Sequence, residues 1–225
     1  MGKLSRDQIA WRIAQDLKEG WFVNLGVGIP LKVSAYIPAN LDVLFHSENG
    51  IIGVGPSPKP GEEDPEIINA GKGYATLVPG ASFFDSSLSF SIVRGKHLDV
   101  AIVGAFQVSR SGDLANWKVP GHKWGGIGGA ADLSVGTKRL WIAMAHTTED
   151  GSPKIVEKCA FPLTGIGVVS RIYTDLAVIE VDRQNGGLTL VEVAPGITPE
   201  YVSSQTGAEL KMRNKVREMD LKEIH

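Results

Sequence analysis

The sequence predicts an α/β fold in which residues 1–225 form a single domain around a doubly wound, mostly parallel sheet with an antiparallel edge. Apolar, β-rich runs alternate along the chain with helical patterns, an order typical of parallel sheets. Residues 97–106 are apolar over enough length to form a strand covered on both faces. Residues 185–187, Asn-Gly-Gly, separate two β-rich runs and predict an antiparallel hairpin.

A helix is predicted near the N-terminus. Ser5 and Gln8 have the spacing of a capping box, and the residues after them keep one helical face apolar until Gly20. Residues 21–26 then predict a buried strand. Glycine and proline at three positions after it predict a turn into a second short helix: Gly26, Gly28 and Pro30.

A second strand is predicted over residues 42–46, and it ends abruptly at residues 47–50, Ser-Glu-Asn-Gly. Residues 53–65 are rich in proline, glycine and acids and predict a surface loop. Residues 82–94 carry apolar side chains at helical intervals and predict a helix closed by Gly95. The remaining β-rich runs predict strands over residues 74–78, 97–106, 138–145, 175–181 and 188–193.

Composition excludes several classes of protein. With 23 basic and 25 acidic residues, the net charge of −2 gives no positive field for nucleic acid or anionic lipid. Uncharged stretches are shorter than the ~18 residues that span a bilayer. The N-terminus carries charge at once and lacks the apolar region of a secretory signal, so a cytoplasmic location is expected.

Metal and disulfide chemistry are not expected. The single cysteine, Cys159, excludes an internal disulfide and a multi-cysteine site, and it is expected to be a small buried hydrophobe. Of the five histidines, four are dispersed within the chain and show no spacing typical of zinc ligands: His46, His97, His122 and His146.

Glu48 is the first candidate for catalysis. Parallel sheets bind ligands beyond the carboxyl ends of their strands, and Glu48 follows a predicted strand directly. The neighbouring apolar residues could desolvate its carboxylate and make it a stronger base or nucleophile, whereas the simplest alternative is a solvated turn residue. His46 lies two residues earlier on the same strand face; it either tunes the carboxylate or is simply held by hydrogen bonds.

Residues 45–53, Phe-His-Ser-Glu-Asn-Gly-Ile-Ile-Gly, match in full the signature around the catalytic glutamate in the B subunit of family I CoA transferases. Further segments resemble the 3-oxoacid CoA transferase B subunit in the same order: residues 55–72, 79–95, 97–109, 112–117, 128–133, 162–165 and 170–181. The chain is therefore identified as similar to this family over nearly its whole length, which implies a CoA-transferase-like fold.

The resemblance implies a two-step acyl exchange. Glu48 would attack an acyl-CoA, with succinyl-CoA as the expected donor, and would become a glutamyl-CoA thioester that a 3-oxoacid then discharges. The main-chain N–H of Gly129 is the implied donor to the oxyanion, with a second donor from a separate A subunit. CoA is a substrate here, so no cofactor is implied.

The glycine cluster around Gly129 has two other interpretations. Gly126, Gly128 and Ala131 fit a loose dinucleotide-binding pattern, but no clear strand precedes them, so an NAD site is not expected. A turn-rich connector is the other interpretation, plausible for Gly125 and Gly126. Relatives commonly carry a lysine where Gly125 stands.

The resemblance and the glycine-rich turns also suggest contacts to CoA and substrate. Lys72 could contact a phosphate or a carboxylate, although an exposed lysine is the ordinary alternative. The expected binding residues are Gly26, Gly28, Asn49, Gly50, Asn69, Gly71, Lys72 and Asn116.

The expected partner is a CoA transferase A subunit, in an A2B2 heterotetramer. Residues 104–109, 162–167 and 170–181 look more like 3-oxoadipate enzymes, whereas residues 79–87 and 117–121 look more like acetoacetate enzymes, so 3-oxoadipate is slightly favoured as acceptor and acetoacetate stays open. Two alternatives remain. Glu48 could use water in a thioesterase, or the chain could be a silent binding subunit, although the intact residues 47–50 argue against silence.

Overall fold

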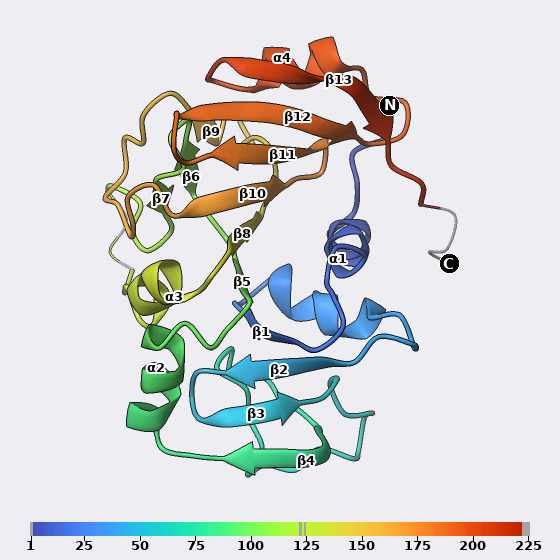
Figure 1. Ribbon diagram of the computed structural model, residues 1–225, viewed down its shortest axis with the longest axis vertical. Helices are drawn as coiled ribbons and strands as arrows, with labels where there is room; N and C mark the ends of the chain where they lie inside the picture. The colour runs from blue at the N-terminus through green and yellow to red at the C-terminus, as the bar shows by residue number, and fades with distance from the viewer. Residues whose placement is uncertain (1, 122, 124, 222–225) are drawn as a thin grey trace.

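The computed structural model describes residues 2–121, 123 and 125–221, which form a 10-stranded sheet in the order β13-β12-β11-β10-β8-β5-β1-β2-β3-β4 (Figure 1). The strands are β1 (Trp21–Leu25), β2 (Val43–Ser47), β3 (Ile51–Val54), β4 (Leu77–Phe83), β5 (Val100–Val103), β8 (Leu140–Ala143), β10 (Val169–Tyr173), β11 (Ala177–Asp182), β12 (Gly187–Val193) and β13 (Leu210–Glu218).

The centre of the sheet is parallel from β10 through β8, β5 and β1 to β2. Antiparallel pairing occurs toward both ends, through β3 and β4 at one end and through β11 at the other, where the predicted hairpin joins β11 to β12. The predicted mostly parallel sheet is thus confirmed, with antiparallel strands on two sides instead of one. Figure 1 shows helices on both sides of the sheet.

Helix α1 (Arg6–Ala14) begins at the predicted capping box, in which Ser5 and Gln8 satisfy each other's backbone N–H groups. It ends before Gly20, and its buried face packs into the core of the sheet. The predicted second short helix is a 3-10 helix, η1 (Pro30–Tyr36), with proline at its start. It lies beside α1, in contact through the ion pair of Lys32 with Asp7 at 2.9 Å.

The helix predicted over residues 82–94 is shorter than expected. Phe83 pairs with Ile51 in the antiparallel ladder of β3 and β4, so the helical spacing there is overridden by strand pairing. Helix α2 (Ser86–Arg94) begins only after Asp85, whose carboxylate accepts from the N–H of Leu88 at 2.8 Å. The strand predicted over residues 74–78 likewise begins later, at Leu77.

A separate three-stranded sheet, in the order β7-β6-β9, packs beside the carboxyl end of β5. It consists of β6 (Gln107–Ser109), β7 (Leu114–Ala115) and β9 (Ile155–Val156). β6 and β9 are parallel, with Val108 opposite Ile155, so two distant segments of the chain lie side by side. Helix α3 (Ala130–Gly136) lies against α2 (Figure 1).

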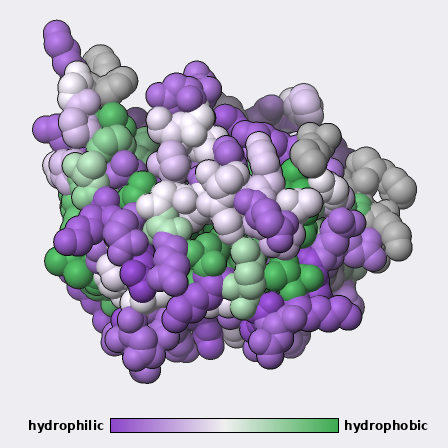
Figure 2. All heavy atoms as spheres, turned by 90° about the horizontal axis from the view of Figure 1, so that it is seen from above, coloured by the Kyte–Doolittle hydropathy of each residue, from purple (hydrophilic) through white to green (hydrophobic). Residues whose placement is uncertain are grey.

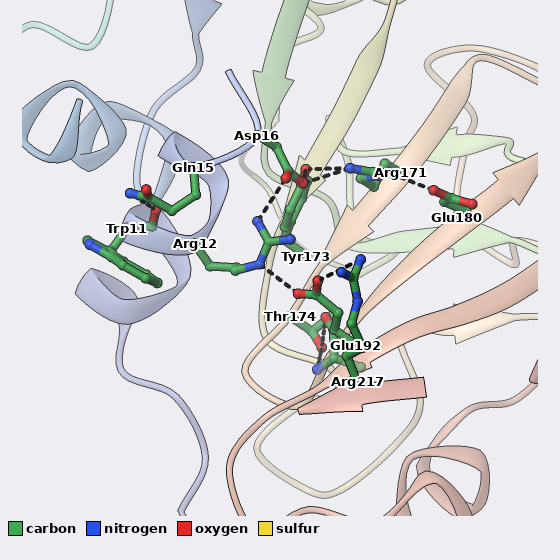
Figure 3. Close-up of polar contacts among 11 residues, drawn as sticks. Trp11, Arg12, Gln15, Asp16, Arg171, Tyr173, Thr174, Glu180, Glu192 and Arg217 are labelled. Atoms are coloured by element: carbon green, nitrogen blue, oxygen red, sulfur yellow. Dashed lines mark hydrogen bonds and ion pairs between the residues drawn. The ribbon is translucent and has the colours of Figure 1, made fainter. Parts of the chain in front are cut away.

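Charged side chains join α1 to the far half of the sheet (Figure 3). Arg12 Nε donates to Glu192 Oε2 at 2.7 Å, and Asp16 accepts from Arg171 and from the Tyr173 hydroxyl, each at 2.7 Å. These ion pairs, Arg12 with Glu192 and Arg171 with Asp16, are partly buried, so loss of either partner would leave an unpaired charge and destabilise the fold.

The end of the molecule formed by β13 and helix α4 (Pro199–Gln205) is mainly polar, with apolar side chains in small separate groups (Figure 2). β13 is an edge strand rich in lysine and arginine, a composition that discourages pairing with another sheet edge. Within the described residues, no helix is long and apolar enough to cross a membrane.

Candidate active site

Glu48 lies in the tight turn that joins β2 to β3. The N–H of Gly50 donates to the Ser47 carbonyl at 2.9 Å, and the Gly50 carbonyl accepts from the N–H of Phe84 at 3.0 Å. Gly50 has φ +117, and a Cβ there would lie 2.1 Å from the Phe84 carbonyl oxygen. Only glycine fits this position, so the turn has one defined shape and presents the half-buried Glu48 side chain in a fixed direction.

Asn24 on β1 holds the Glu48 carboxylate. Its Nδ2 donates to Glu48 Oε2 at 2.9 Å, and the side chain is fully buried. The opposite orientation of the amide would place Oδ1 against the carboxylate, so the acidic neighbour defines which end faces Glu48. Asn24 Oδ1 is buried without a hydrogen-bond partner among the described residues, so an unsatisfied acceptor lies next to the carboxylate.

His46 continues this chain of contacts away from Glu48. Its Nδ1 lies 3.2 Å from Asn24 Nδ2, and its Nε2 lies 3.0 Å from Ser89 Oγ on α2. Burial lowers the pKa of His46 to about 4, so the ring is neutral at physiological pH. Asn24 Nδ2 also donates to the His46 carbonyl at 3.2 Å, so Asn24 contacts both the ring and the backbone of His46. His46 therefore reaches Glu48 through Asn24 and is held by hydrogen bonds.

Gly129 lies beside the Glu48 side chain, at the start of α3. A Cβ on Gly129 would stand 3.6 Å from Glu48 Cγ and 3.0 Å from the ring of Phe90. Its φ of −79 is open to any residue, so the restriction here is space. Within the described part of the chain its N–H has no hydrogen-bond partner.

A cavity of about 410 Å³ opens beside Glu48. Five of its lining residues are Gly26, Glu48, Asn116, Gly129 and Lys154. The rest of the described lining is apolar or glycine: Val27, Val103, Gly104, Ala105, Phe106, Ile127, Ala130 and Leu133. The cavity therefore combines one carboxylate, one cation and apolar walls, which is suited to a small charged acyl group.

Comparison with known proteins gives the family. Residues 6–205 match the coenzyme A transferase family. The chain belongs to this family.

Two relatives show how close the match is. Over 209 residues the chain is 49% identical to the B subunit of the 3-oxoadipate CoA-transferase of Acinetobacter baylyi, covering 92% of this chain and 95% of the relative. Over 214 residues it is 46% identical to the B subunit of a probable succinyl-CoA:3-ketoacid coenzyme A transferase of Bacillus subtilis, covering 95% and 98%. The CoA transferase predicted from residues 45–53 is thus confirmed at the level of the family.

The fold agrees with this assignment. The acyl-CoA transferase of E. coli O157:H7, solved as a thioester complex with CoA, superposes with a TM-score of 0.74 at 20% sequence identity. The superposition covers 98% of this chain and 43% of that longer chain. At this identity the similarity establishes the CoA transferase fold.

In this CoA transferase the predicted binding residues fall into two groups. Gly26 and Asn116 line the Glu48 cavity. Asn116 is held in place there, because its Nδ2 donates to the Gly104 carbonyl at 3.1 Å and its Oδ1 accepts from the Thr164 hydroxyl at 2.6 Å. The others lie outside the lining of this cavity: Gly28, Asn49, Gly50, Asn69, Gly71 and Lys72.

Two of these outer residues shape the loop between β3 and β4. Asn49 Nδ2 donates to the Ile68 carbonyl at 2.7 Å, and Asn69 Oδ1 accepts from the N–H groups of Gly71 and Gly73 at 2.9 and 3.2 Å. Asn69 also lines a second cavity, of about 310 Å³, on this side of the turn.

The remaining outer residues are mostly at the surface. Gly28 is exposed with φ +93, and Lys72 is exposed with φ +65. Gly71 packs closely against Leu31, whose side chain would lie 2.8 Å from a Cβ at that position. Gly71 therefore has a packing reason to be glycine in this chain.

The glycine cluster does not have the context of a dinucleotide site. The described residues between Asn116 and Gly129 include no strand, and α3 begins at Ala130 directly after a loop. The strand, turn and helix that such a site needs are not formed there.

Cys159 is half-buried and its Sγ lies 3.7 Å from the Asp113 carbonyl, away from the Glu48 cavity. Burial raises the pKa of its thiol to about 11, so it is protonated and a poor nucleophile. Among the described residues no group of three or more His, Cys, Asp or Glu side chains could hold a metal ion. His122 lies outside the described residues.

Several site residues were missed from the sequence. Asn24 did carry a signal, since it is the one polar residue in an otherwise apolar strand, Trp21–Leu25. Phe90 and Ser89 come from α2, and Lys154 comes from the segment before β9. Nothing local in the sequence indicates that these residues lie around the Glu48 turn and its cavity, because tertiary packing alone brings them there.

Proposed function

We propose that this chain is the glutamate-bearing B subunit of a 3-oxoacid CoA transferase. It moves CoA from an acyl-CoA, in particular succinyl-CoA, to a 3-oxoacid through a glutamyl-CoA thioester on Glu48. The observation that carries the proposal is the Glu48 carboxylate at the wall of a cavity, fixed by the 2.9 Å hydrogen bond from Asn24. The names of the two relatives, one acting on 3-oxoadipate and one on a 3-ketoacid, support the substrate class.

The first step consumes the incoming thioester. A Glu48 carboxylate oxygen attacks the acyl-CoA carbonyl carbon, the carbon–sulfur bond breaks, and CoA leaves as a thiolate from a mixed anhydride. The thiolate then attacks the Glu48 carbonyl carbon of the anhydride. The acyl group departs as a carboxylate, and CoA remains on Glu48 as a thioester.

The acceptor acid repeats these steps in reverse. Its carboxylate attacks the glutamyl-CoA thioester, and the released thiolate then attacks the acceptor carbonyl, so Glu48 is regenerated as a carboxylate. A glutamate resembles the acid substrates chemically, which keeps both half-reactions close to thermoneutral. No net hydrolysis occurs, so water must be kept from the intermediates.

Two contacts in the site suit this chemistry. The Asn24 amide donates to the Glu48 carboxylate and holds the nucleophile in one position. Each addition creates an oxyanion, and the main-chain N–H of Gly129, a residue beside the Glu48 side chain, is its donor in this proposal. A single such donor stabilises a tetrahedral intermediate by about 2.7–4 kcal/mol.

The partner in this proposal is a separate A subunit that supplies the second oxyanion donor and closes the site, in an A2B2 assembly. Three apolar side chains at the cavity are exposed: Val27, Phe106 and Ile127 are 66%, 39% and 42% accessible. An apolar rim around a reacting group is typical of a surface that another protein covers. Both relatives carry the name of a B subunit, which supports a partner of this kind.

The test is to trap the intermediate on the enzyme assembled with its A subunit. Incubation with an acyl-CoA and no acceptor should add CoA to the peptide containing Glu48, as measured by mass spectrometry. The isosteric variant Glu48→Gln should carry no adduct and lose several orders of magnitude in transfer, whereas Glu62→Gln, an exposed loop position, should behave as wild type.

The same experiment separates the alternatives. Acid released to water without transfer to an acceptor would make the chain a thioesterase. Transfer retained by Glu48→Gln, or an adduct on Cys159, would overturn the mechanism.

A further inference from the structure

One lysine, Lys154, lines the Glu48 cavity and has no role in the proposed reaction. Of the described residues that line it, Glu48 and Lys154 are the two with ionisable side chains. Apart from Asn116, the rest of the described lining is apolar or glycine, with Val103, Ala105 and Leu133 among its residues. A cavity with a carboxylate, a cation and mainly apolar walls has the chemical groups suited to a short dicarboxylic acid.

Backbone hydrogen bonds fix the position of Lys154. Its N–H donates to the His146 carbonyl at 3.2 Å, and its carbonyl accepts from the N–H of Val108 at 2.9 Å. The next residue, Ile155, begins β9 and pairs with β6. The position of the lysine is therefore set by the three-stranded sheet.

The ammonium group of Lys154 is available to a ligand. Lys154 is half-buried and makes no ion pair or side-chain hydrogen bond with the rest of the described chain. Burial lowers the pKa of Lys154, an effect that the nearby charge of Asp175 opposes. Asp175 itself already pairs with Lys3 at 3.6 Å and accepts from the His146 N–H at 2.6 Å. A partly desolvated cation with no direct partner gains from a bound anion.

We propose that Lys154 binds the second carboxylate of a dicarboxylic substrate, the one that does not become the thioester. The proposal rests on the function proposed for Glu48 and narrows its substrates to dicarboxylic acids such as succinate and 3-oxoadipate. Acetoacetate, with a single carboxylate, would leave Lys154 without a partner. Lys154 then determines specificity and takes no part in the bond changes at Glu48.

The test compares two acceptors of equal length, 3-oxoadipate and 3-oxohexanoate, which differ by a carboxylate in place of a methyl group. The enzyme, assembled with its A subunit, is first loaded on Glu48 with the monocarboxylic donor acetoacetyl-CoA and then discharged by each acid. Wild type should prefer 3-oxoadipate. In Lys154→Gln the kcat/KM for 3-oxoadipate should fall about 10- to 100-fold, mainly through KM, while that for 3-oxohexanoate is unchanged.

Two further variants make the result specific. Lys154→Arg keeps the charge and should retain part of the preference for 3-oxoadipate. Lys158→Gln, at an exposed position in the same segment, should behave as wild type. An equal loss with both acceptors in Lys154→Gln, or a wild type that does not distinguish the two acids, would overturn the proposal.

A measurement of ligand binding tests the role of Lys154 independently of the proposed transferase reaction. If wild type formed no CoA adduct on Glu48, the proposed transferase mechanism would fail. Calorimetric binding of 3-oxoadipate and 3-oxohexanoate to the assembled protein still tests Lys154 in that case. Tighter binding of 3-oxoadipate that is lost in Lys154→Gln supports the site, and equal binding of both acids rejects it.

Discussion

Asn24 and Glu48 lie 24 positions apart in the sequence and are joined by a hydrogen bond of 2.9 Å from Nδ2 to Oε2. The contact spans two neighbouring parallel strands, because Asn24 on β1 is the register partner of His46 on β2, and Glu48 follows that strand. The Glu48 carboxylate is thus anchored to the middle of the sheet, while the turn that carries it lies at the edge of the parallel region.

The first prediction concerns this anchor. Asn24→Asp keeps the shape of the side chain and places a second carboxylate against Glu48. The ionised carboxylate cannot donate a hydrogen bond and repels Glu48, so the Glu48 side chain loses the contact that fixes it. We expect the rate of glutamyl-CoA formation at pH 7 to fall by about 10- to 100-fold, the scale of a lost hydrogen bond to a charged group.

The matched control is Asn40→Asp, which introduces the same charge at an exposed turn position. Its rate of glutamyl-CoA formation should equal that of wild type. If Asn24→Asp formed the thioester at the wild-type rate, Asn24 would be a packing residue without influence on Glu48.

The second prediction concerns the buried ring of His46. Its pKa is lowered to about 4 by burial, below the ordinary value of 6.5, so between these two pH values the unfolded chain binds a proton that the folded chain excludes. Stability therefore decreases as the pH falls from 6.5 toward 4. His46→Gln removes the titrating group and should reduce the stability lost between pH 7 and pH 5 by about 2 kcal/mol.

Urea unfolding of the purified chain at the two pH values measures this difference, with the exposed His97→Gln as the control. His146 is also buried with its pKa lowered to about 4, so part of the pH dependence should remain in His46→Gln. If the free energy of unfolding of His46→Gln changed with pH as much as that of wild type, folding would not hold His46 in its neutral form.

The third prediction concerns space at Gly129. Gly129→Val introduces a branched side chain 3.6 Å or less from Glu48 Cγ, while the backbone N–H stays in place. We expect kcat to fall by about 100-fold or more, the range seen when an oxyanion site is disturbed, with a much smaller effect on Tm. Gly126→Ala is the control, because a Cβ at that position meets nothing within 4 Å.

The contact of the new side chain with Phe90 can be tested separately from its contact with Glu48. A Cβ at Gly129 also approaches Phe90 to 3.0 Å, so a variant with Phe90→Leu as well relieves the ring contact but not the contact with Glu48. Activity that stays low in the double variant places the effect at Glu48. Recovery of full turnover would assign it to strain against Phe90.

The fourth prediction concerns the missing partner. Without an A subunit the purified chain should show negligible transfer and at most slow hydrolysis of acyl-CoA, since one oxyanion donor is absent and the site is open to water. Val27→Asp should weaken association with the A subunit, because it places a charge in the exposed apolar rim. Met212→Asp, on the distant edge strand β13, is the control. An isolated chain that transfers CoA at the full rate would contradict the two-subunit site.

Much of this site follows from local patterns in the sequence. The strand before Glu48 and the capping box of α1 are set by neighbouring residues, and both are found close to where they were predicted. The partner of Glu48 could not be predicted in this way, because it depends on the register between β1 and β2. The helix over residues 82–94 was predicted too long for a similar reason: pairing with β3 decides the structure of Phe83.

The small sheet formed by β6, β7 and β9 holds Lys154 separately from the large sheet that carries Glu48, although both residues line one cavity. Glu48 depends on the pairing of β1 with β2, whereas Lys154 depends on the pairing of β6 with β9. If the proposed roles hold, exchange of residues 104–117 and 146–165 between relatives should change which acyl chain lengths are accepted, while the strands that hold Glu48 stay as they are.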